Sequence, residues 1–349
     1  MKNFLKIFVG LLLCIVVVIL GYAVYVFASF NRIEDNLSLT VTASGTKKSA
    51  PIGSEIKITS YNIGFGAYNS DYTFFMNGGK ESRCRSKEIA IENVTGALNK
   101  TKEQNADIML FQEVDIKGTR SYKVNQFDIL QNGLKSNFYS SFAQNYNSPY
   151  LYWPLLSPHG ANKSGIATFS KYQITSALRR SLPIETGVIK VLDLDRCYSV
   201  NRIPTENGKE LVIYNVHLSA YTSDGTIATK QLEMLISDMQ AEFNKGNYCI
   251  AGGDFNKDLP NDSNNTENTW AQPIPNGTIP KELTLIPPKA NPLKSCRDTG
   301  EVYDKESTFT ITVDGFIVSE NIEAISSFVI DTGFEFSDHN PVILSFKLK

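Results

Sequence analysis

The sequence contains little cysteine and little histidine, and this scarcity excludes a common class of metal site. The five cysteines of the 349-residue chain, at positions 14, 84, 197, 249 and 296, form no CxxC pair. Paired thiols at short spacing are the usual mark of a structural zinc site, so the sequence predicts none of that kind. The chain has only three histidines, His159, His217 and His339.

The sequence also lacks an excess of positive charge. It has 34 Lys and Arg residues against 36 Asp and Glu, a formal net charge of −2. Affinity for nucleic acid through counterion release alone is therefore not expected. A hydrophobic content of 42% is typical of a globular protein with a sizeable core. We find no internal repeat and no low-complexity tract.

One long hydrophobic run is present, at the N-terminus. The chain carries no charge from Ile7 to Phe30, and a bilayer-spanning helix needs about 20 apolar residues. Lys2 and Lys6 precede the run and favour a cytoplasmic N-terminus. We expect residues 1–31 to be a single-pass membrane anchor, with the rest of the chain extracytoplasmic. The alternative is a signal peptide that is cleaved near Ala28, which would give a secreted protein.

The remainder of the chain is expected to form a linker and one domain. Residues 32–54 are polar and rich in Ser and Thr, which favours a linker, and residues 55–349 read as a single α/β domain. Residues 257–306 are rich in Asn, Pro and Gly and predict a long irregular loop. Apolar periodicity predicts helices over Ser86–Gln104 and from Asp224 to Phe243. It predicts strands over Glu55–Asn62, Asp107–Glu113, Gly165–Phe169, Val188–Leu194, Glu210–His217, Tyr248–Asp254, Thr308–Val318 and Val342–Phe346.

Polar or acidic residues stand where several of these strands end. The residues concerned are Asn62, Glu113, His217, Asp254 and Asn256. Carboxylate and amide oxygens, with few thiols or imidazoles, are hard ligands that suit Mg²⁺, Mn²⁺ or Ca²⁺ better than zinc. Each residue taken singly also has an ordinary interpretation, such as a turn or a satisfied core histidine.

Asp314 interrupts an otherwise apolar strand, and a buried carboxylate of this kind needs a partner. An Asp–His pair is the natural arrangement, because the carboxylate fixes the imidazole ring and tunes its basicity. Asp338-His339-Asn340-Pro341 comes immediately before the last predicted strand and provides a candidate histidine.

The order of these motifs along the chain resembles a known superfamily. The motifs are YN at 61–62, QE at 112–113, SGIATFSKY at 164–172, NVHLS at 215–219, GGDFN at 252–256, VDGFIVS at 313–319 and FSDHNPV at 336–342. Together they resemble the endonuclease/exonuclease/phosphatase superfamily, which includes deoxyribonuclease I and bacterial sphingomyelinases, from about residue 55 to 348. The resemblance implies a four-layer α/β/β/α sandwich, in which two mixed sheets pack face to face with helices outside. It also implies metal-dependent hydrolysis of a phosphate ester.

The resemblance assigns a metal-binding role to three residues. Glu113 corresponds to the principal Mg²⁺ ligand, Asn62 to a residue that holds the metal or the scissile phosphate, and Asp338 to a residue near the metal. Arg297 is outside the matched motifs. We single it out as a substrate-binding candidate because a guanidinium matches the geometry of a phosphate, while a solvated surface arginine remains the alternative.

The resemblance assigns catalytic roles to five residues. Asp254 would orient or deprotonate the attacking water, and Asn256 would bind the phosphate in the transition state. His217 would contact the phosphate and assist as an acid. His339 would act on the phosphate or as general base, with Asp314 orienting it.

The substrate is left open by the sequence. After Lys2 and Lys6 are set aside, the segment from residue 32 has 32 basic against 36 acidic residues, which makes a DNase-like nuclease less favoured than another phosphoesterase. A catalytically silent binding module is a further alternative. The membrane anchor favours lipid headgroups or other extracellular phosphoesters, and no obligate protein partner is evident. Tyr150, Tyr152 and Trp153 could contact lipid, but core packing is the favoured interpretation.

Overall fold

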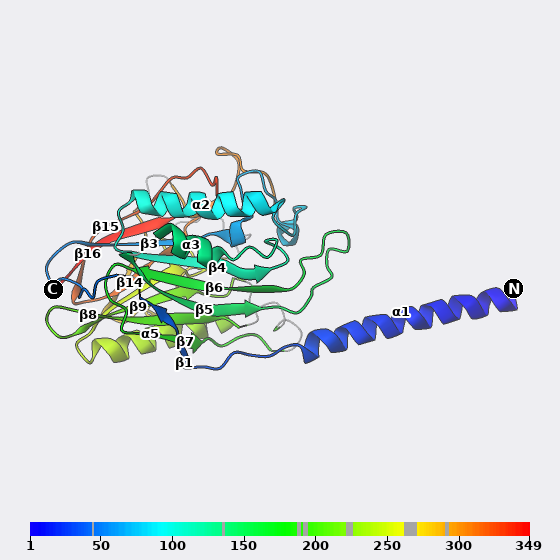
Figure 1. Ribbon diagram of the computed structural model, residues 1–349, viewed down its shortest axis with the longest axis horizontal. Helices are drawn as coiled ribbons and strands as arrows, with labels where there is room; N and C mark the ends of the chain where they lie inside the picture. Colours follow the sequence, from blue (N-terminus) through cyan, green and yellow to red (C-terminus); the bar gives the residue numbers. More distant parts are fainter. Residues whose placement is uncertain are drawn as a thin grey trace.

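Two mixed β-sheets pack face to face, with helices on both outer faces (Figure 1). The computed structural model describes residues 1–43, 45–134, 137–186, 190, 195–220, 226–261, 271–289 and 293–349. The arrangement confirms the predicted four-layer α/β/β/α sandwich. The helix α1 (Lys2–Ala28) projects from one end of the sandwich, and the C-terminus lies at the other (Figure 1).

Each large sheet has seven strands. Sheet I has the order β1 (Leu37–Leu39), β7 (Ser176–Ser181), β8 (Cys197–Pro204), β9 (Glu210–His217), β10 (Tyr248–Asp254), β14 (Asp314–Ser319) and β11 (Leu283–Ile286). Sheet II has the order β15 (Ile322–Val329), β16 (Val342–Leu348), β3 (Ile56–Asn62), β4 (Ile108–Gly118), β6 (Asn162–Ser170), β5 (Tyr139–Asn147) and β2 (Val41–Thr42). Two short strands, β12 (Cys296–Arg297) and β13 (Thr310–Ile311), pair separately.

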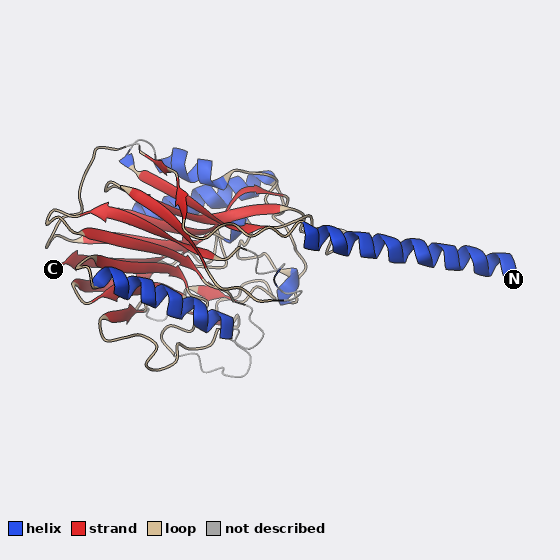
Figure 2. Cartoon of the chain, turned by 90° about the horizontal axis from the view of Figure 1, so that it is seen from below, coloured by secondary structure: helices blue, strands red, loops and turns tan. Residues whose placement is uncertain are grey.

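The outer helices cover the sheets with apolar faces. In α2 (Lys87–Glu103), the Ser86 side chain accepts a hydrogen bond from the Ile89 amide and caps the helix. This helix and α3 (Gln126–Leu134) pack on sheet II, where Val94, Leu98 and Leu130 join its core. The third outer helix, α5 (Thr226–Phe243), packs on sheet I (Figure 2). Asp224, the predicted start of that helix, lies outside the described residues.

The space between the sheets holds an apolar core and a strip of buried polar side chains. Ile58, Leu110 and Ile250 belong to the apolar core. In the polar strip, Gln112 donates a hydrogen bond of 2.8 Å to the side-chain oxygen of Asn215 in the opposite sheet. Because a buried amide is costly when unpaired, this contact fixes how β4 and β9 lie relative to each other. Both strands lead directly into candidate site residues.

Several elements differ from the predicted ones. The segment expected to be a linker, residues 32–54, contributes the edge strands β1 and β2 to the two sheets. The loop predicted over residues 257–306 contains β11 and β12. The strands β7 and β8 were not predicted, because buried polar groups such as Arg179 hide their apolar alternation. The predicted strand 188–194 has only residue 190 among the described residues.

The loop between β5 and β6 is exposed at its tip. Tyr152, Trp153, Leu155 and Leu156 are large hydrophobic residues that remain on the surface. Core packing was the favoured interpretation for the aromatic residues of this segment, and for Tyr152 and Trp153 it was wrong. Both residues lie in a projecting loop beyond the last paired residues of the two strands, so no second layer covers them.

Candidate active site

The candidate residues gather at one end of the sandwich because strand direction brings them there. β3 runs parallel to β4, and β9 runs parallel to β10, so each pair ends at the same edge. Asn62 ends β3, and Glu113 follows the paired part of β4. His217 and Asp254 end β9 and β10 as register partners.

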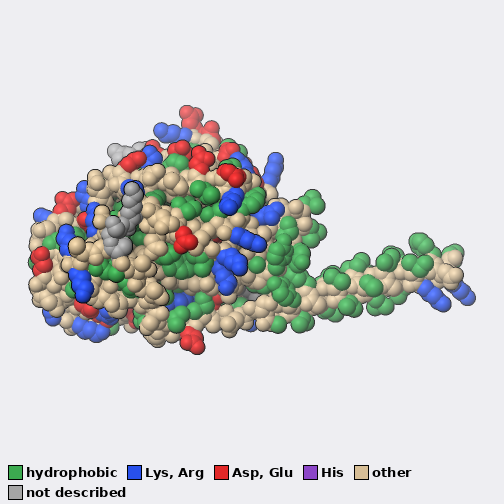
Figure 3. All heavy atoms as spheres, in the orientation of Figure 1, with side chains coloured by type: hydrophobic (Ala, Val, Ile, Leu, Met, Phe, Trp, Pro, Cys, Tyr) green, Lys and Arg blue, Asp and Glu red, His purple; other side chains and the backbone are tan. Residues whose placement is uncertain are grey.

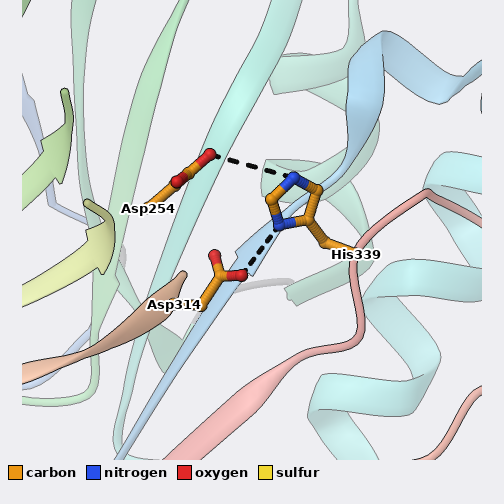
Figure 4. Close-up of side chains that lie close together, drawn as sticks. All are labelled: Asp254, Asp314 and His339. Carbon is orange, nitrogen blue, oxygen red and sulfur yellow. Dashed lines mark hydrogen bonds and ion pairs between the residues drawn. The ribbon is translucent and has the colours of Figure 1, made fainter. Parts of the chain in front are cut away.

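Three side chains form the centre of the site (Figure 4). Asp314 begins β14 and is the register partner of Asp254 in the antiparallel pair of β10 and β14. The Nδ1 atom of His339 lies 2.8 Å from Oδ2 of Asp314, and its Nε2 atom lies 3.8 Å from Oδ2 of Asp254. The imidazole thus lies between two carboxylates, as the sequence predicted for the pair of Asp314 and His339.

The neighbouring charges set different protonation states for the two histidines of the site. Burial acts to lower the pKa of His339, but the Asp314 carboxylate opposes it, and the pKa lies well above its ordinary value. Burial, reinforced by Arg196 and His339, holds the pKa of His217 well below its ordinary value. At neutral pH, His339 is therefore a cationic hydrogen-bond donor, and His217 is a neutral imidazole.

Asp254 is placed to accept a proton. Burial raises the pKa of its carboxyl group, and the negative charge of Asp314 raises it further. The Asp254 carboxylate lies 3.6 Å from Nε2 of His217 and accepts a 3.0 Å hydrogen bond from the Asn62 amide. A buried carboxylate with a raised pKa, held among donors, has the properties of a general base.

Glu113 and Asp338 supply carboxylate oxygens beside this centre, and the side-chain oxygen of Asn62 accepts a hydrogen bond from the Gly64 N–H. The Asn62 amide nitrogen lies 3.3 Å from Oε1 of Glu113. The Ser337 hydroxyl lies 2.8 Å from the backbone carbonyl oxygen of Asn62 and 3.2 Å from Oδ1 of Asp338. Burial raises the pKa of Asp338, and the Glu113 carboxylate adds to the rise against the opposing charge of His339.

These residues fit a divalent metal ion. The charge of Glu113 raises the pKa of Asp338, and a cation between the two carboxylates would offset their repulsion. Amide and carboxylate oxygens are ligands that Mg²⁺ accepts. Glu113 has a positive φ of 55° at a bulge of β4, a strained conformation for a non-glycine residue. Such strain is found at functional sites, where the surrounding structure holds the side chain in place. Asp254, Asp314 and His339 also offer ligand atoms within 4.8 Å of one another. The Asp314 hydrogen bond nevertheless occupies one imidazole nitrogen of that group.

Two glycines allow the backbone to approach closely at the site. A Cβ on Gly253 would lie 2.0 Å from the Val216 carbonyl oxygen, so the GGDFN motif needs glycine there. A Cβ on Gly64 would lie 2.6 Å from the Tyr68 ring and 3.1 Å from Oδ1 of Asp338. Asn256 has a φ of 49°, its backbone N–H donates to Asp254, and its side-chain amide donates to the Leu218 carbonyl oxygen.

Arg297 is not brought to the site as a free cation. Its guanidinium is buried and donates to the backbone carbonyl oxygens of Asn69, Tyr72, Asp298 and Glu301. These hydrogen bonds tie together the loops that surround the site. The terminal nitrogens Nη1 and Nη2 thus have a structural role, whereas the buried Nε has no hydrogen-bond partner among the described residues. Phosphate binding by Arg297 stays a prediction.

The sequence reasoning missed other groups near the site. Arg120 forms a buried ion pair with Asp115 at 2.8 Å, and its guanidinium lies 3.9 Å from the centre of the Phe65 ring. Burial acts to lower its pKa, but Asp115 and Glu113 keep the group charged. Burial raises the pKa of Tyr68, and Asp338 and Glu113 add to the rise, so its phenol stays neutral. Neither residue lies in a strand-end motif, and a buried Arg–Asp pair leaves no periodic signal.

Comparisons with known proteins agree with this geometry. The sequence profile of the endonuclease/exonuclease/phosphatase family matches residues 59–339, from β3 to His339. None of the curated proteins matches the chain.

Several solved structures share the fold. The endonuclease/exonuclease/phosphatase from Beutenbergia cavernae is similar, with a TM-score of 0.58 and 12% identity, over 84% of this chain and 72% of that one. The endonuclease/exonuclease/phosphatase from Bacteroides vulgatus gives a TM-score of 0.55 and 14% identity, over 85% of this chain and 100% of that one. ANGEL2, described as a 2′,3′-cyclic phosphatase, gives a TM-score of 0.53 and 14% identity, over 89% of this chain and 98% of that one. At this identity the likeness shows the fold, whereas the profile match extends over most of the domain and ends at a site residue. The chain belongs to the endonuclease/exonuclease/phosphatase family.

Proposed function

We propose that this protein is a membrane-anchored, extracytoplasmic, Mg²⁺-dependent phosphodiesterase. The family and its structural neighbours hydrolyse phosphoesters, and this chain is a member. The observation that carries the proposal is the group of Asp254, Asp314 and His339, in which one imidazole lies between two buried carboxylates beside Asn62 and Glu113. A pure binding module has no need of that arrangement.

The side chains suggest a division of labour in the reaction. Asp254 orients a water molecule and accepts its proton, because its pKa is raised and its oxygens face the site. His339, held cationic by Asp314, donates a hydrogen bond to a phosphoryl oxygen. His217 and Asn256 complete the group around the phosphate. A Mg²⁺ ion held by Glu113, Asn62 and Asp338 would neutralise charge on the phosphoryl oxygens.

The proposed location rests on α1. This helix is long and apolar enough to cross a membrane, and it begins at Lys2, near the N-terminus. Lys2 and Lys6 favour a cytoplasmic start, which puts the sandwich on the outer side of the membrane.

The first experiment measures hydrolysis of bis(p-nitrophenyl) phosphate by the full-length protein in detergent, with Mg²⁺ and with EDTA. We expect EDTA to abolish turnover, and Asp254→Ala to lower kcat/KM by about 10²–10⁴-fold, as expected for loss of a general base. Asp71→Ala is the matched control, because Asp71 is an exposed carboxylate paired with Arg85 on the surface. Undiminished activity of Asp254→Ala would refute the assignment.

Two further substrates refine the proposal within the same assay. Hydrolysis of p-nitrophenyl phosphate in preference to the diester would indicate a monoesterase. Nicking of plasmid DNA by the wild type, lost in Asp254→Ala, would favour a nuclease. Folded protein that hydrolyses none of the three substrates would contradict the proposal.

A further inference from the structure

The tip of the β5–β6 loop exposes an unusual concentration of large apolar side chains. Trp153 is 66% exposed and Leu155 is 73% exposed, and Tyr152 and Leu156 flank them on the surface. Isolated exposed hydrophobic residues are normal on a soluble surface, but four within five positions mark a contact site. We call residues 152–156 the apolar tip.

The apolar tip lies beside the outer end of α1. The Tyr22 hydroxyl donates to the Tyr150 carbonyl oxygen and accepts a hydrogen bond from the Tyr152 N–H. The Tyr25 hydroxyl accepts a hydrogen bond from the Tyr150 N–H at 3.0 Å. The rings of Tyr22 and Tyr152 also pack edge to face, with centroids 5.3 Å apart. Two helix residues therefore hold the base of the tip.

The length of α1 sets the depth of that contact. At the helical rise of 1.5 Å per residue, Tyr25 lies about 28 Å beyond Lys6. The hydrocarbon core of a bilayer is about 30 Å thick, so a helix with Lys6 at one interface has Tyr22 and Tyr25 near the other. Tyrosine is favoured at that level of the membrane. A loop bonded to both tyrosines must then lie at the membrane surface.

The segment after α1 fixes the domain in this orientation. The guanidinium of Arg179, in β7, donates to the carbonyl oxygens of Ile33 and Glu34. The Ile33 N–H donates to Asp195 at 2.8 Å, and Arg180 pairs with Asp35. These bonds hold the residues that follow the helix against sheet I, so they do not act as a free stalk.

The apolar tip and the candidate active site belong to the same end of the sandwich. His159, near the end of the loop, packs edge to face against Phe65, and its Nδ1 atom lies 2.8 Å from the Ser82 carbonyl oxygen. Phe65 lies in the short helix η1 (Gly64–Gly66), which only Ile63 separates from Asn62. Burial lowers the pKa of His159 to about 4, so this histidine is a neutral packing residue between the loop and the site.

Basic residues stand at the base of the same loop. Lys117 and Lys163 are exposed register partners in the antiparallel pair of β4 and β6. Like charges directly opposite each other cost stability, and within the described part of the chain neither lysine has an ion-pair partner. Figure 3 shows hydrophobic side chains along α1 and on the adjoining end of the domain, with Lys and Arg side chains next to them. An anionic membrane surface would offset the repulsion between Lys117 and Lys163.

We infer that the apolar tip inserts into the outer leaflet of the bilayer that α1 crosses, with Lys117 and Lys163 above anionic headgroups. The catalytic end of the domain then faces the membrane, and its substrate is a phosphodiester in a phospholipid headgroup. This substrate assignment rests on the proposed function, whereas insertion of the tip does not.

Tryptophan fluorescence tests the insertion without any reaction. The chain has two tryptophans, and Trp270→Phe leaves Trp153 as the reporter. The full chain is reconstituted into phosphatidylcholine vesicles containing phosphatidylglycerol. We expect a blue-shifted Trp153 emission that brominated phospholipids quench and aqueous iodide does not. Emission typical of a water-exposed indole, quenched by iodide, would overturn the inference.

Turnover by the same vesicles tests the substrate. We expect Leu155→Ser with Leu156→Ser to lower hydrolysis of vesicle phospholipid by about tenfold or more, since each buried leucine contributes a large transfer free energy. Hydrolysis of soluble bis(p-nitrophenyl) phosphate should stay unchanged. The matched control is Ile325→Ser with Phe328→Ser, which removes exposed apolar residues from β15.

The outcomes separate the inference from the function on which it rests. Hydrolysis of the soluble diester without any hydrolysis of phospholipid, or phospholipid hydrolysis unaffected by the leucine substitutions, would overturn the substrate assignment and leave the phosphodiesterase intact. No hydrolysis of either substrate by the wild type would overturn the proposed function, and the Trp153 emission would still decide whether the tip inserts.

Discussion

At the residue scale, the hydrogen bond between Asp314 and His339 leads to a prediction about the pH dependence of the proposed activity. The Asp314 carboxylate raises the pKa of His339, so wild-type activity should fall at alkaline pH, where the imidazole loses its proton. Asp314→Asn removes the carboxylate charge that raises the pKa of His339. We therefore expect the alkaline limb of the kcat/KM profile to move to lower pH. The maximal rate should fall by about 10³–10⁴-fold, as expected when a histidine loses its orienting carboxylate.

The control for this change leaves the pair of Asp314 and His339 intact and alters a carboxylate outside it. Asp298→Asn replaces a carboxylate in the same group of loops that accepts a hydrogen bond from the Gly300 N–H. Its pH profile should match the wild type. An alkaline limb that stays in place in Asp314→Asn would show that another group titrates there.

Some residue-scale features could be predicted from sequence, and others could not. Asp314 stood out because a carboxylate in an apolar strand needs a partner, and the structure supplies His339. Arg297 was singled out for its chemistry alone, and sequence could not show that backbone carbonyl groups occupy its guanidinium. Arg120 was missed because its proximity to Glu113 depends on the fold of the intervening turn.

At the element scale, one buried carboxylate joins α5 to sheet I. Glu242 of α5 accepts a 2.7 Å hydrogen bond from Arg202 in β8, and Lys245 and Asn247 donate to the same group. Burial acts to raise its pKa, but these donors lower it to about 2. The folded pKa lies below the unfolded value, so the resulting stabilisation is present above about pH 4.5 and is lost as the pH falls toward 2.

We therefore expect Glu242→Gln to lower the free energy of unfolding at pH 7 by about 2 kcal/mol, because charge-assisted hydrogen bonds are lost. The difference from wild type should shrink as the pH is lowered from 5 to 2. Urea unfolding at several pH values measures both effects. Glu210→Gln is the comparison, since Glu210 contacts the same Arg202 but is more exposed. A difference that grows on acidification would contradict the assignment.

Element prediction succeeded where apolar spacing was strong. The strand that ends at Asn62 had an alternating apolar pattern, those that end at His217 and Asp254 had apolar runs, and all three are present. The short edge strands β1 and β2 could not be predicted, because their partners are distant in sequence and their side chains are largely exposed. Strand pairing of this kind depends on the shape of the finished sheets.

At the scale of the whole molecule, the proposed membrane location depends on α1. If α1 is retained as an anchor, the protein should stay in the membrane pellet after an alkaline carbonate wash, and its N-terminal peptide should include residues before Ala28. Membrane fractionation with N-terminal sequencing measures both properties. Soluble protein that begins near Ser29 would establish cleavage and would remove Tyr22 and Tyr25 from the mature chain.

The general architecture followed from the family resemblance that the order of motifs carries, but the orientation of the domain did not. The apolar run at the N-terminus predicted an anchor without showing which end of the sandwich it meets. That information lies in contacts between residues far apart in the chain, such as Tyr22 with Tyr150.

Contacts between residues far apart in sequence also have a consequence for biosynthesis. The Ser337 hydroxyl contacts the Asn62 carbonyl oxygen across 275 positions of sequence, and β16, the last strand, pairs directly with β3. A ribosome makes Asn62 early and His339 almost at the end. Until the final strand has been made, sheet II lacks an inner strand, and the imidazole has not reached Asp254 and Asp314. The candidate site is therefore complete only after almost the whole chain has been made.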